Sequence, residues 1–380
     1  MTQLNMQITD FNLDYLSSDE KNRFYKVFQI LNDIWDRVQE QIISTCKKSN
    51  LSPVFPSIHT RGYHTIEHTT GVVKHCYQLA LPLHTKLPQE YTAIDVLVLV
   101  IAGMLHDYIQ DGDINLVIKK YTTLQNNAIV SKTAKIPVFK RETGNNEFSS
   151  ANIGIQWMKE YNKQYNMVIF KPENINALLN LIQSTEPDFG RVVVLEGDNL
   201  IEYTTVVQPK LINPIVITRW IICVSDLGTV AFCPDQLIND AYKLIREEIW
   251  ESNLIKILNG ELDPRINKLA YQDCCIISSI ITEFINFQSS FVKAQKQRTK
   301  NYIAMFEPEL QELVLPFFEN FSNESNESNE DKNKEQLSNF DQALKSVDQE
   351  IMIINNLHQQ IVNHDYKAFL EMLVRAKYIK

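Results

Sequence analysis

Histidine is scarce in this sequence, and three of its eight histidines fall in one short segment. His64, His68 and His75 are spaced by four and seven residues, so a helix that begins at or before His64 carries all three on one face. Imidazole nitrogens can bind a metal ion or transfer a proton near neutral pH. Since a histidine on an amphipathic face is more often structural than functional, we interpret His75 as structural.

Two aspartates stand in strongly apolar surroundings. His106 and Asp107 follow the run V-L-V-L-V-I-A-G-M-L, and Asp226 is the only charged residue between Arg219 and Asp235. Burying a carboxylate without a partner is costly, so each aspartate needs one. For either aspartate alone, a helix cap or a buried ion pair would suffice.

Taken together, these residues are what a divalent cation needs. A histidine on one helix, a His-Asp pair on a second and an aspartate on a third supply imidazole and carboxylate ligands, which suit Mn, Fe, Mg or Zn. One or two such ions would offset the buried negative charge. A bound ion would also lower the pKa of a bound water towards about 7, which makes hydroxide available at neutral pH.

The motif Y-H-T-I-E-H at 63–68, the pair His106-Asp107 and the later Asp226 resemble the HD-domain metal-dependent phosphohydrolase superfamily, whose signature is H…HD…D on an all-α bundle. The resemblance covers roughly residues 55–305. Its start is similar to the cyclic-nucleotide phosphodiesterase catalytic domain, although Thr65 stands where phosphodiesterases have Asn. The strings N-N-E-F-S-S-A at 145–151 and S-T-E-P-D-F at 184–189 are similar to uncharacterised bacterial HD proteins.

The resemblance implies a role for each residue of the motif. His68, His106, Asp107 and Asp226 would bind the metal, with Asp107 bridging two ions if a second is present. His64 would protonate the leaving oxygen while hydroxide attacks phosphorus. The implied substrate is a phosphate mono- or diester, for example a nucleotide or cyclic nucleotide.

A second interpretation concerns Glu67. The string His64 to His68 also reads H-x-x-E-H, the pattern of certain zinc metallopeptidases, with Glu142 or Glu147 as a later carboxylate. This alternative leaves His106, Asp107 and Asp226 unexplained. Only 10 glycines and few strand signals also favour helices over the α+β fold of such peptidases.

Two further residues are candidates for contacts around the site. Arg61, three residues before His64, could contact a phosphate oxygen. Glu147 could accept a hydrogen bond from a metal-binding histidine. A surface arginine and a helix-start glutamate are the simpler interpretations of these two residues.

Composition limits the partners and the location. The net charge of −9 argues against an extended nucleic-acid surface. The most apolar stretch, Val96 to Leu105, is ten residues, and a membrane span needs about 20. The first twenty residues have no secretory signal pattern, and six cysteines without a C-x-x-C predict reduced thiols. We therefore expect a cytoplasmic protein.

Hydrophobic periodicity predicts an all-α fold of the HD/phosphodiesterase kind, and Pro82 is expected to close the helix that carries the histidines. The expected helices are 17–47, 65–79, 92–109, 147–165 and 173–183, with further helical sequence over 216–257 and 268–306. Residues 186–214 are irregular, with a small hairpin around Val192 to Leu195. We expect a catalytic domain at 1–318, an acidic low-complexity linker at 319–338 and a C-terminal helical segment at 339–380 that packs on the body or on a protein partner.

These observations predict a metal-dependent phosphohydrolase that acts on a small phosphate ester. The alternative from another class is a non-catalytic regulatory or adaptor protein that keeps the helical bundle and its metal as structure. Its C-terminal helix would then recruit a partner.

Overall fold

The structure, a computed structural model, is mostly helical, with 64% helix and 14% strand. The predicted all-α class therefore holds for most of the protein but omits two small antiparallel sheets. The structure describes residues 6–48, 62–196, 199–211, 216–227, 229–249, 251–258, 260–318 and 339–380.

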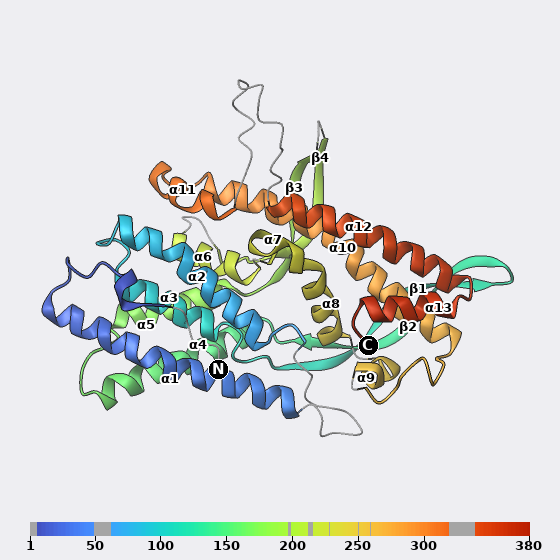
Figure 1. Ribbon diagram of the computed structural model, residues 1–380, viewed down its shortest axis with the longest axis horizontal. Coiled ribbons are helices and arrows are strands. Elements are labelled where there is room, and N and C mark those ends of the chain that lie inside the picture. The colour runs from blue at the N-terminus through green and yellow to red at the C-terminus, as the bar shows by residue number, and fades with distance from the viewer. Residues whose placement is uncertain are drawn as a thin grey trace.

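The elements follow one another in the order shown in Figure 1. The first half contains η1 (Ile8–Asp10), α1 (Ser18–Lys48), α2 (Ile66–Lys86), α3 (Ala93–Leu105), β1 (Gly112–Gln125), β2 (Ala128–Arg141), α4 (Asn145–Gln164), α5 (Pro172–Ser184), β3 (Asp188–Glu196) and β4 (Asn199–Val207). The second half contains α6 (Ile217–Asp226), α7 (Thr229–Phe232), η3 (Pro234–Gln236), α8 (Leu237–Glu248), α9 (Ser252–Leu258), α10 (Tyr271–Ile303), α11 (Pro308–Val314), η4 (Leu315–Phe318), α12 (Asn339–Val362) and α13 (Tyr366–Arg375).

Helix α3 is the most buried helix of the described chain. Thr92 and Asp95 form a capping box at its start, each side chain bonded to the backbone N–H of the other. Every residue from Val96 to Leu105 is buried. The chain therefore delivers His106 directly from the interior, as the apolar run predicts.

Helix α2 does not end where the sequence predicts. It continues through Pro82 to Lys86. Proline inside a helix removes one backbone hydrogen bond and costs about 3 kcal/mol. Leu79 and Leu83, each 1% exposed, pack in the core on either side of Pro82 and supply the burial that offsets this cost.

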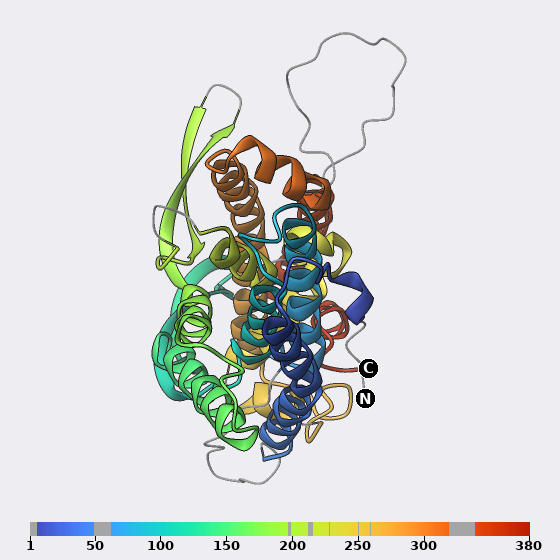
Figure 2. The same cartoon turned by 90° about the vertical axis from the view of Figure 1, so that its left-hand side faces the viewer.

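The β1–β2 hairpin is the main feature that the sequence prediction missed. Its 14-residue strands pair from Gly112 with Arg141 to Gln125 with Ala128. Asn126 and Asn127 form the turn with φ of 51° and 60°, a conformation that asparagine tolerates. The two ends of the hairpin, Gly112 and Arg141, pair with each other, and Gly112 follows Asp107 closely in the sequence. The β3–β4 hairpin, expected from residues 192–195, is present and projects beyond the helices in Figures 1 and 2.

The core of the protein has two parts. The first part joins buried side chains of α1 to α6, which lie on the left of Figure 1. The second joins β1, β2, α8, α9 and α13, on the right. Helices α10 and α12 contribute to both parts. Helix α8 and strand β2 of the second part reach the candidate site, where Glu247 and Arg141 contact His64.

The C-terminal segment packs on the body. Helix α12 lies along α10, and α13 folds back against α12. Glu350 of α12, 7% exposed, accepts hydrogen bonds from the Tyr242 hydroxyl of α8 (2.7 Å) and from Nη2 of Arg375 of α13 (2.7 Å). The three helices are thereby joined by one carboxylate. The linker expected at 319–338 lies outside the described residues.

Within the described ranges, one helix is long and apolar enough to cross a membrane by length and composition. This is α10, and 56% of its most apolar window is buried inside the protein, as in the core helix of many soluble proteins. The cysteines whose side chains are described, at 76, 223, 233, 274 and 275, are all free thiols.

Candidate functional site

Three helix ends bring the predicted metal ligands together. Thr65 is the N-cap of α2 and accepts a hydrogen bond from the backbone N–H of His68 (3.5 Å), so His68 lies in the first turn of that helix. His106 is the C-cap of α3, and Asp107 follows it. Asp226 is the last residue of α6. Each ligand is thus fixed by a buried helix and points from its end.

The ligand atoms form one compact cluster. Nε2 of His68 and Nε2 of His106 lie 3.2 Å and 2.9 Å from Oδ2 of Asp107. The same two nitrogens lie 3.5 Å and 3.3 Å from Oδ1 of Asp226. All four ligand atoms are within 4.8 Å of one another, and the four residues could hold a metal ion. The structure therefore brings together the four residues that the sequence predicts as metal ligands.

Burial and charge act in opposite directions in this cluster. Burial alone would lower the pKa of His68 and of His106, but the carboxylates of Asp107 and Asp226 outweigh it and raise both pKa values. Burial alone would raise the pKa of Asp107 and of Asp226, and the histidines lower both instead. The aspartates therefore favour the charged form of the two imidazoles, and the imidazoles favour the ionised form of the aspartates.

Neighbouring groups orient the ligands. Nδ1 of His106 donates to the carbonyl oxygen of Gly103 (2.8 Å), which leaves Nε2 facing the cluster. The side-chain amide of Gln110 donates to Oδ1 of Asp107 (2.7 Å) and leaves Oδ2 towards the two imidazoles. Two imidazole nitrogens and two carboxylate oxygens, oriented in this way, fit a divalent cation such as Mn, Fe, Zn or Mg.

His64 lies beside the cluster and is held by a glutamate that the sequence prediction missed. Nδ1 of His64 donates to Oε1 of Glu247 (2.6 Å), and the backbone N–H groups of Gly62, Tyr63 and His64 donate to Oε2 (2.9, 2.8 and 3.2 Å). A Cβ atom at Gly62 would lie 2.6 Å from the carbonyl oxygen of Lys243. Glycine there allows the chain to approach α8 closely enough for these bonds.

An arginine from the β1–β2 hairpin contacts the other nitrogen of His64. Nη1 of Arg141 lies 2.5 Å from Nε2 of His64 and 3.3 Å from Oε1 of Gln110. Nη2 lies 3.6 Å from Oε1 of Glu248. Nε2 of His64 is 3.9 Å from Oδ2 of Asp107. Burial, and then the charge of Arg141, lower the pKa of His64, which accepts through Nε2 in this arrangement.

The lesser candidates occupy different places. Glu67 lies beside the cluster, and its hydrogen bond with the Thr65 side chain lowers its pKa. Glu147 is buried, which raises its pKa, and it accepts from the backbone N–H of Gly144 (2.5 Å) at the start of α4. Arg61 lies outside the described residues.

His75 lies away from the four ligand atoms. Its ring stacks on Phe232 with 4.1 Å between the ring centroids. Burial, and then the charge of Lys74, lower the pKa of His75 to about 4. It is therefore a neutral imidazole at pH 7, packed against an aromatic ring.

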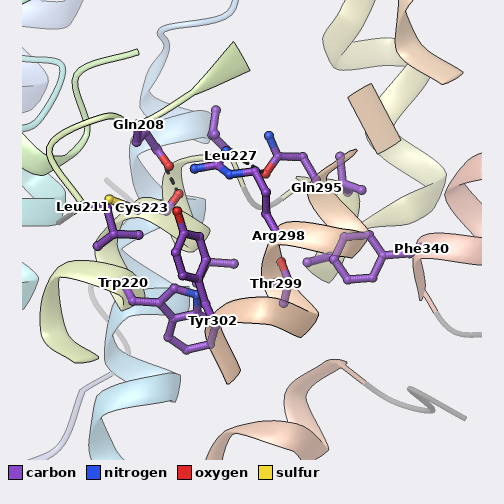
Figure 3. A pocket seen from close by; sticks show the side chains of 13 residues that line it. Gln208, Leu211, Trp220, Cys223, Leu227, Gln295, Arg298, Thr299, Tyr302 and Phe340 are labelled. Atoms are coloured by element: carbon purple, nitrogen blue, oxygen red, sulfur yellow. Dashed lines mark hydrogen bonds between the residues drawn. The ribbon is translucent and has the colours of Figure 1, made fainter. Parts of the chain in front are cut away.

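Two pockets flank Asp226. One opens over His68 and Asp226, and its lining includes Tyr63, Glu67 and Lys243, so a small molecule can reach these two ligands. The other lies between α6 and α10 (Figure 3). There Gln208 donates to the carbonyl oxygen of Cys223 (3.2 Å) and lies 3.4 Å from Oδ2 of Asp226. Gln208 therefore connects the end of β4 to the end of α6.

No protein-family model matches its sequence, no curated protein matches it, and no solved structure matches it.

Proposed function

We propose that this protein is a metal-dependent phosphohydrolase of the HD type. The observation that carries the proposal is the convergence of His68, His106, Asp107 and Asp226 from three buried helix ends, with the predicted proton donor His64 next to Asp107. The order of these residues along the chain is that of the H…HD…D signature. Their arrangement supports the proposal independently of the signature, because it brings together residues up to 158 positions apart, from 68 to 226.

A divalent cation held by the four ligands would supply the activation of water and the neutralisation of phosphoryl charge that phosphate-ester hydrolysis requires. The side chains of the protein would supply proton transfer and access for the substrate. Glu247 keeps a proton on Nδ1 of His64, so Nε2 is the nitrogen that exchanges a proton with the leaving oxygen. The pocket over His68 and Asp226 admits the substrate.

The geometry argues against the metallopeptidase alternative. In that pattern His64 and His68 bind one zinc ion from the same helix. Here α2 begins after Thr65, and both ring nitrogens of His64 are engaged, one by Glu247 and one by Arg141. The side chain of Glu67 is hydrogen-bonded to Thr65.

The test is hydrolysis by the purified protein of phosphate monoesters, diesters, nucleotides and cyclic nucleotides, with Mn, Mg, Zn and Fe(II) in turn. Asp107→Asn is the blank, because it removes a ligand charge with little change in shape. Asp348→Asn, at an exposed position of α12, is the matched control. We expect turnover that is lost in Asp107→Asn and kept in Asp348→Asn. Equal turnover in wild type and Asp107→Asn would refute the proposal.

A further inference from the structure

The β1–β2 hairpin places a cation at the candidate site. Arg141 is the last residue of β2, and the hairpin is inserted between Asp107 and α4. Its far part is fixed to α10, because the backbone N–H groups of Thr122 and Leu124 donate to the hydroxyls of Ser279 (3.2 Å) and Tyr271 (3.0 Å). The position of Arg141 is therefore set by a sheet that is attached at both ends.

The guanidinium of Arg141 has one loose ion pair, and the nearby carboxylates of Glu248, Glu247, Asp107 and Glu147 raise its pKa. Its carboxylate neighbour Glu248 is 3.6 Å away and 35% exposed, which is a loose ion pair. Its closer contacts are Nε2 of His64 (2.5 Å) and the amide oxygen of Gln110 (3.3 Å), and neither is a carboxylate. Yet the side chain of Arg141 is only 20% exposed. A partly buried guanidinium whose closest contacts are not carboxylates keeps N–H donors that an oxyanion can take.

The location of Arg141 suits a phosphoryl group. Gln110 contacts Arg141 on one side and Asp107 on the other, and His64 does the same. The guanidinium is thus one side chain away from the metal ligands. A planar guanidinium donates two parallel hydrogen bonds to phosphate oxygens, which lysine cannot do.

Resting on the proposed phosphohydrolase function, we propose that Arg141 binds the nonbridging oxygens of the substrate's phosphoryl group. The β1–β2 hairpin thereby supplies the anion contact of the site. On binding, phosphate takes the place of Nε2 of His64 at Nη1 of Arg141. The substrate class is then an ester with at least one charged phosphoryl oxygen, and uncharged carboxylic esters are excluded.

The test is binding of inorganic phosphate to the Mn-loaded protein, followed by titration calorimetry, with metal content measured alongside. Arg141→Gln removes the charge, and Arg141→Lys keeps the charge and the neighbouring ion pair but loses the paired geometry. Arg191→Gln, at a position 77% exposed on β3, is the matched control.

We expect Arg141→Gln to weaken phosphate binding by about 10- to 150-fold, the range for loss of a charge-assisted hydrogen bond. Arg141→Lys should fall between wild type and Arg141→Gln, and Arg191→Gln should bind as wild type. Metal content should stay unchanged in all of them. Wild-type phosphate affinity in Arg141→Gln overturns the proposal, and if that variant does not fold, wild-type affinity in Arg141→Lys overturns it.

The binding experiment separates this inference from the proposed function. If the wild type hydrolyses no ester but binds phosphate through Arg141, the phosphohydrolase function fails and the anion site stands. If the wild type hydrolyses esters but Arg141→Gln binds phosphate normally, only the inference about Arg141 fails. A wild-type protein that loads metal and binds no phosphate also overturns the inference.

Discussion

Glu247 offers a prediction whose size can be worked out from the structure. Its side chain is 1% exposed, and it accepts four hydrogen bonds, three from backbone N–H groups and one from Nδ1 of His64. Glu247→Ala leaves all four donors without this acceptor. An unsatisfied buried donor costs about 1–3 kcal/mol. Since water and relaxation recover part of the sum, we expect the free energy of unfolding to fall by about 3–5 kcal/mol.

Glu247→Gln is expected to separate stability from chemistry. Its amide oxygen can take the position of Oε2 and keep the three backbone bonds, so stability should fall by no more than about 1–3 kcal/mol. Its NH2 group then faces Nδ1 of His64 and forces the proton onto Nε2, against Arg141. A carboxylate that fixes a catalytic histidine contributes up to about 10,000-fold in other enzymes, so we expect turnover to fall by about 100- to 10,000-fold.

The assays are urea unfolding at equilibrium, initial rates of phosphate-ester hydrolysis, and metal content of the purified proteins. Glu283→Gln, at a position 63% exposed on α10, is the control and should match the wild type in all three. If the unfolding free energy of Glu247→Ala lies within about 1 kcal/mol of wild type, the four hydrogen bonds do not stabilise the protein by the expected amount. Full turnover in Glu247→Gln would refute the assigned tautomer of His64.

Three further predictions use other parts of the molecule. His64→Ala should keep its metal content and lose most of kcat, and unchanged kcat would remove His64 from the mechanism. His75→Phe should reduce the dependence of the unfolding free energy on pH. The pKa of His75 is about 4 in the folded protein and about 6.5 when unfolded, so the wild type loses about 2–3 kcal/mol of stability as pH falls from 7 to 4. Urea titrations at both pH values should show that the variant does not lose this part of its stability. Phe369→Ala in α13, at a fully buried position, should lower the free energy of unfolding by about 3–5 kcal/mol, and an unaffected unfolding curve would contradict the packing of α13 on the body.

The sequence alone predicts site residues where an ionisable side chain interrupts an apolar segment. A charge inside an apolar run is a signal at the level of single residues, and it identified Asp107 and Asp226 with the helices that carry them. The start of α3 can also be recognised in the sequence, because Thr92 and Asp95 have the residue types and the three-residue spacing of a capping box.

The missed features depend on contacts between distant parts of the chain. Glu247 is one of two adjacent glutamates on an amphipathic helix, and only the packing of α8 decides which of them faces His64, 183 residues earlier. Arg141 was not among the predicted site residues, because the β1–β2 hairpin that carries it was not predicted. A signal for that hairpin was available, since Asn126 and Asn127 divide two segments rich in β-branched residues.

Glu350 connects the order in which the helices are synthesised to the candidate site. The four candidate metal ligands precede residue 227 in the sequence and α8 with Glu247 soon follows, but α12 and α13, which hold α8 through Glu350, come later. A chain that is still being synthesised can therefore bring these four residues together before Glu350 fixes the helix that supports His64. Synthesis of α12 and α13 then becomes the event that secures the support of His64, and a chain truncated before α12 carries the cluster without that support.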